Sequence, residues 1–117
     1  MKIEINNLDI SINKKQILKS AFLQINSGEI VGVFGDSGSG KSVLCFFIMG
    51  FLNNSIFKCS AKSAFFINDN YTFDFNSNNE SLWCDFRKKY ISIIFQDPTT
   101  SLNPTIKCGH QMEEYFY

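Results

Sequence analysis

The sequence has no excess of charge of either sign, because eleven Lys and Arg residues balance eleven Asp and Glu residues in a chain of 117. A balanced chain has no overall field that attracts nucleic acid or anionic lipid, so recognition of an anion has to be local. The cysteines form no C-x-x-C pair, which argues against metal or redox chemistry; they are Cys45, Cys59, Cys84 and Cys108. No signal peptide is evident, and the longest apolar run, 43–52, is too short to span a bilayer. These absences predict a cytosolic globular protein of one domain.

Glycine is also missing between Gly50 and Gly109, and asparagine is frequent in the first part of that interval. Asn tolerates the left-handed backbone conformation that Gly otherwise supplies, so the Asn-Asp-Asn stretch at 68–70 predicts the bend of a hairpin over 63–75. The segment that follows the hairpin, 78–89, predicts a short helix.

Strand-like periodicity dominates the beginning of the chain. Apolar residues nearly alternate over 2–12, with an interruption at 6–7, and 16–26 is again strand-like. Polar turn signals at 13–15 and at 27–28 follow these two segments. The sequence therefore predicts paired strands in the N-terminal part.

Two later runs, 29–34 and 90–95, are short, rich in β-branched residues and apolar on both faces. Such runs are typical of strands buried in the centre of a parallel α/β sheet. The first run leads into the glycine-rich stretch 35–40 and then into an apolar stretch of helical length that ends at Leu52. We interpret the apolar stripe of this helix as core packing; it consists of Leu44, Phe47, Ile48 and Phe51. The order of strand, glycine-rich loop and helix predicts an α/β fold.

The sequence GDSGSGKS at 35–42 matches the phosphate-binding pattern G-x-x-x-x-G-K-[ST] at every fixed position. Gly38 and Gly40 permit a backbone path that turns successive N–H groups inward, and the following helix adds unpaired N–H groups of its own. We expect the Lys41 ammonium to reach β- and γ-phosphate oxygens and the Ser42 hydroxyl to bind a bridging Mg²⁺. The predicted nucleotide-contacting residues are Gly35, Asp36, Ser37, Gly38, Ser39, Gly40, Lys41, Ser42 and Val43.

A second chemical signal is the sequence FQDPTTSLNP, which begins at the end of the run 90–95. An acidic residue after an apolar strand is a metal ligand in many P-loop enzymes, which makes Asp97 one candidate. The other candidate is Gln96, and in that case Asp97 only begins a turn before Pro98. The residues alone leave both interpretations open.

With GEIVGVFGDSGSGKSVLCFFIMGFL (28–52) and ISIIFQDPTTSLNP (91–104) together, the chain resembles the ATP-binding subunits of ABC transporters. The most similar group serves oligopeptide, dipeptide and nickel importers. The resemblance implies a P-loop NTPase core of the ABC type with an N-terminal antiparallel β subdomain, incomplete at the C-terminus. Residues 1–117 would be the N-terminal part of the ATP-binding domain, with the P-loop at 35–42, a divergent insert at 53–85 and the Q-loop at 95–104.

The resemblance also makes Gln96 the Q-loop residue, whose amide is expected to position Mg²⁺ and the attacking water. It implies ATP and Mg²⁺ as cofactors, and membrane permease subunits and a second ATP-binding subunit as partners. The implied function is to couple ATP binding and hydrolysis to the import of peptides or nickel. The implied location is the cytoplasmic face of the cell membrane.

The sequence departs from the family pattern in several places. It ends before the LSGGQ signature, the Walker B glutamate and the switch histidine, so we expect little ATP turnover. We interpret His110, Glu113 and Glu114 as surface residues rather than as substitutes for these groups. Ile12 stands where the family usually stacks an aromatic ring on adenine. The basic run 87–89 predicts a solvated helix end.

Two other interpretations stay open. The chain could be truncated or degenerate and fold poorly, because strands at 29–34 and 90–95 would lack neighbours to cover them. It could also be a soluble P-loop ATPase without a transport role, in which Asp97 is the metal ligand.

Overall fold

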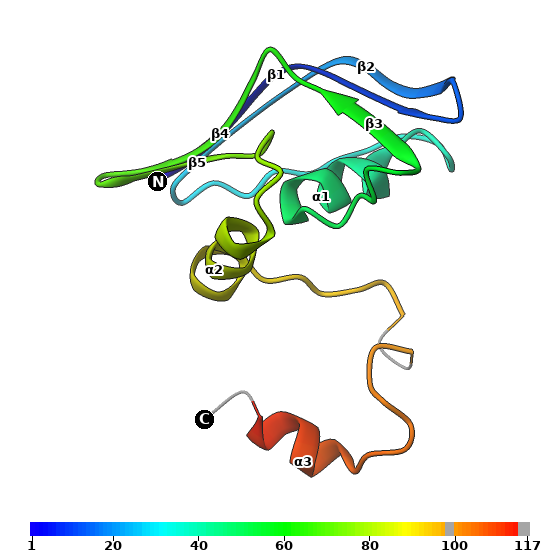
Figure 1. The fold of residues 1–117 in the computed structure, drawn as a ribbon, viewed down its shortest axis with the longest axis vertical. Coiled ribbons are helices and arrows are strands. Elements are labelled where there is room, and N and C mark those ends of the chain that lie inside the picture. Colours follow the sequence, from blue (N-terminus) through cyan, green and yellow to red (C-terminus); the bar gives the residue numbers. More distant parts are fainter. Residues whose placement is uncertain (98–99, 115–117) are drawn as a thin grey trace.

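One antiparallel five-stranded sheet forms the upper layer of the molecule in Figure 1. The computed structural model describes residues 1–97 and 100–114. The strands are β1 (Lys2–Ile12), β2 (Lys15–Asn26), β3 (Phe57–Ser60), β4 (Ser63–Asn68) and β5 (Tyr71–Asp74). The helices are α1 (Lys41–Met49), α2 (Glu80–Tyr90) and α3 (Cys108–Glu113).

Strand β1 lies at the centre of the sheet, in the order β2-β1-β4-β5. It pairs with β2 along one side, while β4 and β3 share the other side, β4 beside its first half and β3 beside its second half. The register with β2 shifts between Ile5 and Leu8, where Asn7 has a φ of +51°. This bulge confirms the interruption predicted at 6–7 and lets the apolar residues on both sides of it point into the core.

The predicted turns and hairpin of the sheet are confirmed. Asn13 and Lys14 form the turn between β1 and β2 with φ values of +46° and +68°. Asp69 and Asn70 form the turn between β4 and β5, and the Asn68 side chain accepts a hydrogen bond from the Asp69 backbone N–H at 3.0 Å. Polar residues thus close both turns without glycine.

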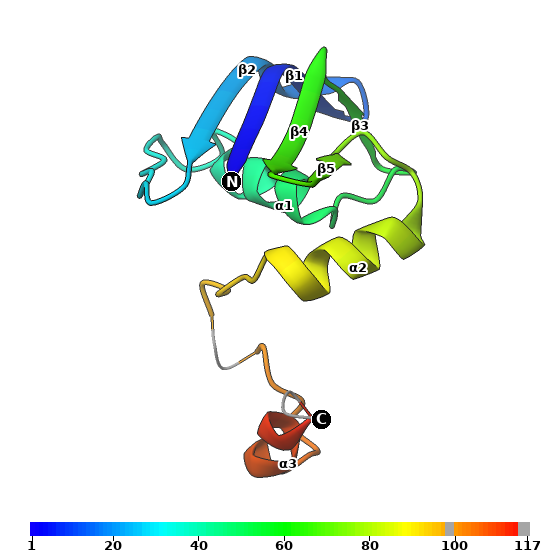
Figure 2. The ribbon, with the colours of Figure 1, turned by 90° about the vertical axis from the view of Figure 1, so that its left-hand side faces the viewer.

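The core lies between the sheet and helices α1 and α2, which pack below it in Figure 2. Aromatic rings dominate this layer. Phe86 of α2 stacks on Phe73 of β5 with ring centroids 4.3 Å apart, and it meets Phe66 of β4 edge-on at 5.1 Å. The other buried residues of the core are Ile5, Leu8, Ile10, Phe47, Ala64, Phe75 and Trp83. The helix predicted over 78–89 therefore exists because one of its faces completes an aromatic core.

Helix α2 begins with a side-chain cap, since the Asn79 carboxamide oxygen accepts hydrogen bonds from the N–H groups of Ser81 at 3.0 Å and Leu82 at 3.4 Å. Helix α3, near the end of the chain, has no buried residue. It lies apart from the sheet in Figure 1.

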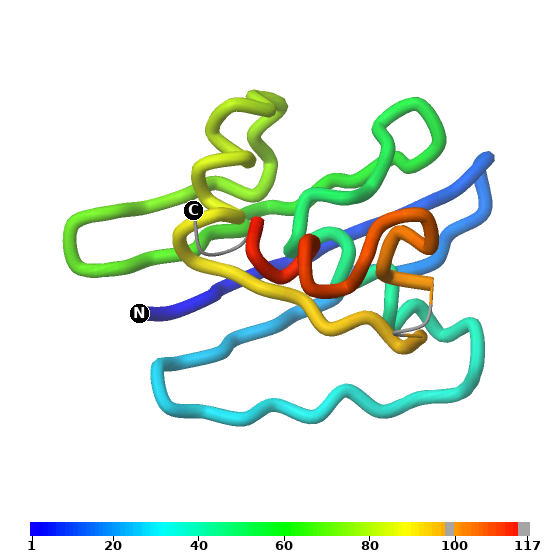
Figure 3. The backbone as a smooth tube through the Cα atoms, turned by 90° about the horizontal axis from the view of Figure 1, so that it is seen from below, coloured from blue at the N-terminus to red at the C-terminus, as the bar shows by residue number. Residues whose placement is uncertain are grey.

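The two central strands predicted at 29–34 and 90–95 are wrong. Residues 29–34 and 91–95 form no ladder among the described residues, and Tyr90 is the last residue of α2. Figure 3 shows them as separate lengths of backbone. Ile30 is fully exposed and Ile94 is 97% exposed. The apolar, β-branched composition favours a strand, but a strand also needs a neighbour that accepts its backbone hydrogen bonds, and the described residues offer none.

The helix after the glycine-rich loop is confirmed but ends earlier than predicted, at Met49 rather than Leu52. Gly50 takes the left-handed conformation, with φ +67°, and its N–H bonds to the Phe47 carbonyl at 3.0 Å. This is a typical glycine C-cap, and it stops the helix.

Candidate functional site

The loop 35–40 approaches the sheet closely at its last residue. Gly40 is buried and has a φ of +95°, in the left-handed region. A Cβ atom there would lie 2.7 Å from Leu18 Cδ2 and 3.3 Å from Ile17 Cγ2, both on β2. Any larger residue would therefore push the loop away from the sheet, which explains why the sequence has glycine at this position.

The Lys41 side chain folds back over this loop. Its ammonium donates hydrogen bonds to the Gly35 carbonyl at 2.7 Å, to the Asp36 carbonyl at 2.6 Å and to the Ser39 hydroxyl at 3.3 Å. The loop itself is closed by a hydrogen bond from the Ser39 N–H to the Asp36 carbonyl at 3.1 Å. The positive charge is thus held at the loop by neutral acceptors and not by an acidic partner.

Helix α1 begins directly after the loop, and none of the described side chains caps it. Its first turn also contains no acidic residue. The N–H groups of a first helical turn have no partner within the helix, and here they belong to Lys41, Ser42 and Val43. Unpaired N–H groups, the positive end of the helix dipole and the Lys41 ammonium therefore meet at one place.

An open cleft of about 910 Å³ lies between the start of α1 and the extended segment after α2. Lys41 and Ser42 lie on the first wall, and Gln96 and Asp97 on the second. The other lining residues are Val33, Cys45, Phe46, Ile93, Ile94, Phe95, Thr100 and Ser101. The structure therefore brings the glycine-rich loop and the FQD sequence to the same cleft, although they are far apart in the chain.

Both candidates for the polar residue at the end of the run 90–95 reach this cleft, so the geometry alone does not choose between Gln96 and Asp97. The Asp97 backbone carbonyl accepts hydrogen bonds from the hydroxyls of Thr100 at 3.2 Å and Ser101 at 2.9 Å. The turn predicted at Pro98 itself lies outside the described residues, as does part of the segment 95–104.

The remaining residues singled out in the sequence lie elsewhere. Ile12 ends β1, where it is half-buried opposite Lys15 and Phe57, and it is not part of the cleft lining. His110 and Glu113 are exposed on α3, as predicted.

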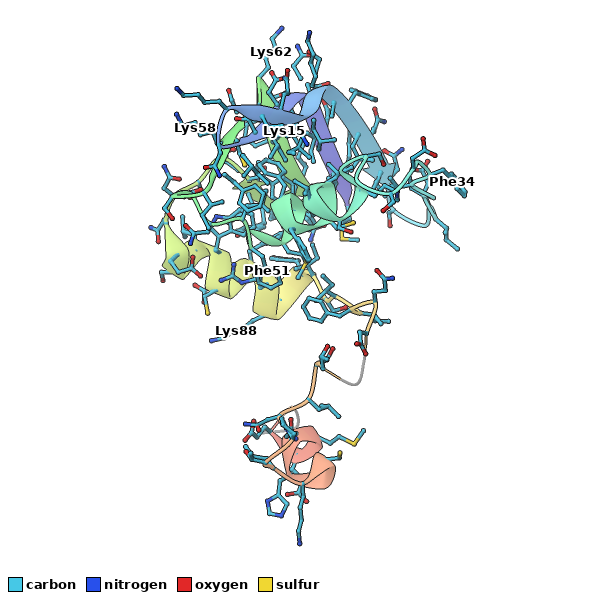
Figure 4. The ribbon with its side chains drawn as sticks, turned by 90° about the vertical axis from the view of Figure 1, so that its right-hand side faces the viewer. Lys15, Phe34, Phe51, Lys58, Lys62 and Lys88 are labelled. Atoms are coloured by element: carbon cyan, nitrogen blue, oxygen red, sulfur yellow. The ribbon has the colours of Figure 1, made fainter. Side chains whose placement is uncertain are left out.

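The basic run 87–89 divides into two kinds of residue. Lys88 and Lys89 are exposed, as predicted for a solvated helix end, and Figure 4 shows Lys88 directed away from the protein. For Arg87 that prediction is wrong, because this side chain is only 20% exposed and contacts α1. The sequence did contain a signal: Arg87 lies four residues after Trp83, so both belong to the same, buried face of α2.

In the part of the chain that the structure describes, no group of three or more His, Cys, Asp or Glu residues is arranged to hold a metal. Within residues 1–97 and 100–114, no helix combines the length and the apolar character needed to cross a membrane.

The site thus consists of a glycine-rich loop, the uncapped helix that follows it and a second polar segment opposite them. Proteins of the class that binds anions at a helix terminus have this arrangement of loop and helix. Comparison with known proteins identifies the family: the sequence pattern described as "ABC transporter" matches residues 18–114. The chain belongs to this family, which confirms the resemblance found in the sequence.

Several curated relatives are similar over most of this chain. The oligopeptide transport ATP-binding protein OppD of Mycoplasma pneumoniae is 38% identical, over 98% of this chain and 27% of its own length. AppD of Bacillus subtilis, also an oligopeptide transport ATP-binding protein, is 35% identical over 96% of this chain and 34% of its own length. The dipeptide transport ATP-binding protein DppD of Haemophilus influenzae is 39% identical, over 78% of this chain and 26% of its own length. The chain thus spans about a quarter to a third of the length of these relatives.

Proposed function

We propose that this chain is an ATP-binding component of an ABC importer for peptides. The observation that carries the proposal is the Lys41 ammonium, held by loop carbonyls beside the uncapped first turn of α1. A triphosphate tail is rich in anionic oxygens, and such oxygens accept hydrogen bonds from helix-terminal N–H groups and from an ammonium. Membership of the family and the names of the relatives support ATP as the ligand and peptides as the cargo of the assembled transporter.

The backbone of the loop and the Lys41 side chain have different roles in the proposed phosphate binding. Residues 35–43 surround the phosphates in the proposal, with the N–H groups of the loop and of the first helical turn as donors. Lys41 exchanges its bonds to the Gly35 and Asp36 carbonyls for bonds to phosphate, so it is already oriented toward the loop before ATP binds. An ammonium held in this way loses little side-chain freedom when the nucleotide arrives.

The site also fits Mg²⁺ bound together with the nucleotide. Mg²⁺ prefers oxygen ligands and usually takes one or two from the protein and the others from phosphates and water. The Ser42 hydroxyl and the Gln96 amide oxygen are of this kind, and both residues line the cleft. When bound, the ion would neutralise phosphate charge, while Ser42 and Gln96 would hold it from the two walls.

The proposal extends to the architecture and the partners. We assign the P-loop of an ABC-type P-loop NTPase to 35–42, the divergent insert to 53–85 and the Q-loop to 95–104, with residues 1–26 in the antiparallel β subdomain. Membrane permease subunits and a second ATP-binding subunit are the proposed partners, at the cytoplasmic face of the membrane. The relatives, which are named as transport ATP-binding proteins, support this assignment.

Titration of the full chain with a fluorescent ATP analogue tests the proposal. We expect Lys41→Ala to weaken binding by roughly a hundredfold, because a charge-assisted bond to phosphate contributes about 1.5–3 kcal/mol. Lys62→Ala is the matched control, since Lys62 is exposed on the opposite, sheet side of the molecule in Figure 4. Thermal melting should be the same for both variants. Equal binding by wild type and Lys41→Ala would refute the proposed site.

A further inference from the structure

Arg87 connects helix α2 to the C-terminal end of helix α1. Its guanidinium donates a hydrogen bond to the Met49 carbonyl at 3.3 Å, and Met49 is the last residue of α1. The same guanidinium forms an ion pair with Glu80, two turns earlier on α2. Only 20% of the Arg87 side chain is exposed, so its bond to the Met49 carbonyl is partly shielded from solvent, whereas the Glu80 side chain is 78% exposed and the ion pair is screened.

Two aromatic rings lie near the guanidinium. Its central carbon lies 5.4 Å from the centre of the Phe51 ring, just beyond α1, and 5.9 Å from that of Trp83 on α2. Figure 4 shows Phe51 between the two helices. The Trp83 ring also covers Gly50, where an added Cβ would be only 2.5 Å away from it. Backbone, ring and cation contacts thus converge on the junction of α1 and α2.

The charge of Arg87 suits its position. The C-terminal end of a helix carries a partial negative charge, and α1 has no basic residue in its own last turn. Arg87 supplies the missing cation from the neighbouring helix. Lys88 and Lys89 belong to the same basic run, but their exposure shows that they do not share this contact.

The junction links the two walls of the cleft. Helix α1 bears Lys41 and Ser42 at its first turn and is held by Arg87 at its last residue. Helix α2 ends at Tyr90 and continues directly into the extended segment that contains Gln96. A contact that holds α1 against α2 therefore fixes the point from which the segment leading to Gln96 starts, relative to the helix that bears Ser42.

We propose that Arg87 is a positioning residue that keeps the Ser42 wall and the Gln96 wall of the cleft aligned for a magnesium-bound nucleotide. The inference rests on the proposed function. Phosphate binding without metal needs only the loop and the first turn of α1, whereas magnesium held from both walls needs their alignment. Loss of Arg87 should therefore reduce the gain in affinity that Mg²⁺ provides, and leave metal-free binding almost unchanged.

The size of the effect follows from the population of aligned molecules. If the junction without Arg87 is aligned about one time in ten, the apparent affinity for the magnesium-bound nucleotide falls about tenfold. The conservative change Arg87→Lys keeps a cation near the Met49 carbonyl but loses the planar guanidinium that contacts the Phe51 and Trp83 rings. It should recover part of the loss.

The experiment titrates the full chain with the fluorescent ATP analogue, in EDTA and in Mg²⁺, for wild type, Arg87→Ala, Arg87→Lys and the control Lys88→Ala. Trp83, the single tryptophan of the chain, lies at the junction, so its emission spectrum reports the contact directly. We expect a shifted emission and a loss of about tenfold in magnesium-dependent affinity for Arg87→Ala. Arg87→Lys should be intermediate, and Lys88→Ala unchanged.

Three other results would contradict the inference, and each would have a different meaning. If metal-free and magnesium-dependent affinity fall together in Arg87→Lys, a variant chosen because it keeps the charge and the fold, Arg87 has only a structural role. If neither changes in a variant with a normal melting curve, the junction does not control the cleft. If the wild-type chain binds no nucleotide in either buffer, the proposed function itself fails, whatever the Trp83 emission shows.

Discussion

Two neighbouring residues, Gln96 and Asp97, are the alternative metal ligands in the two functional interpretations of this chain. Both line the cleft opposite Lys41 and Ser42, and they differ in chemistry: an amide oxygen is a weak, neutral metal ligand, whereas a carboxylate is a strong, charged one. In the transport interpretation Gln96 contacts the ion and Asp97 only begins a turn; the Asp97 carbonyl accepts hydrogen bonds from the hydroxyls of Thr100 and Ser101. In the interpretation as a soluble ATPase, Asp97 is the metal ligand.

Single substitutions at these two positions separate the interpretations. We expect Gln96→Ala to lower the magnesium-dependent affinity for nucleotide by roughly fivefold, because one neutral oxygen ligand is lost at a cost of about 1 kcal/mol. Asp97→Asn keeps the size of the side chain and should change this affinity little. The measurement is the nucleotide titration at several Mg²⁺ concentrations. The opposite pattern, with a large loss for Asp97→Asn alone, would support the soluble ATPase.

At the residue scale, the sequence predicted the candidate site better than the contacts that position it. The loop 35–42 is a contiguous pattern, so its chemistry can be read without a fold. Arg87 carries no such pattern, because its partners Met49 and Phe51 come from a distant part of the chain, at and just beyond the end of α1. Its spacing from Trp83 placed it on the buried face of α2, but only the packing of α2 on α1 reveals which carbonyl it meets.

At the scale of elements, predictions from local sequence signals were confirmed, whereas the two strands that need a distant partner were wrongly predicted. Strands β1 and β2, the hairpin of β4 and β5 and helix α2 each form from a neighbouring partner or a side-chain cap, so periodicity and turn chemistry were sufficient. The runs 29–34 and 91–95 have the composition of central strands, yet they form no ladder in the described part of the chain. Composition expresses a preference for a strand, but only a paired neighbour realises it.

The end of α1 supplies a prediction at the same scale. Gly50→Ala places a methyl group 2.5 Å from Trp83 Cε3 and in a left-handed backbone conformation, with φ +67°. We expect the free energy of unfolding to fall by roughly 1–3 kcal/mol, from strain and from displacement of the ring. Urea denaturation followed by Trp83 fluorescence measures it. Gly109→Ala in α3 is the matched control, because nothing lies within 4 Å of its added Cβ. A neutral Gly50→Ala would show that α1 and α2 are not in close contact.

At the scale of the whole molecule, the apolar surface is distributed unevenly. Apolar side chains are buried between the sheet and helices α1 and α2, whereas large apolar side chains of segments 29–34 and 91–95 are exposed. Ile30 is 100% exposed, Phe34 93% and Ile94 97%. Contiguous exposed apolar surface marks either an interaction site or a risk of aggregation. The molecule thus combines a half with a buried aromatic core and an apolar surface that lacks a cover among the described residues.

This asymmetry can be measured with a hydrophobic dye. We expect the native chain to bind 8-anilinonaphthalene-1-sulfonate, and the double change Ile30→Asn with Ile94→Asn to weaken the dye fluorescence severalfold. The melting temperature should stay the same, because side chains that are almost fully exposed contribute little to folded packing, and such substitutions usually alter stability by less than about 0.5 kcal/mol. Leu82→Asn is the control, since Leu82 is 47% exposed on α2, outside both segments. If the native chain bound no dye, or if the double change lowered the melting temperature by many degrees, the two segments would be buried in solution. They would then be part of the core, as the sequence had predicted.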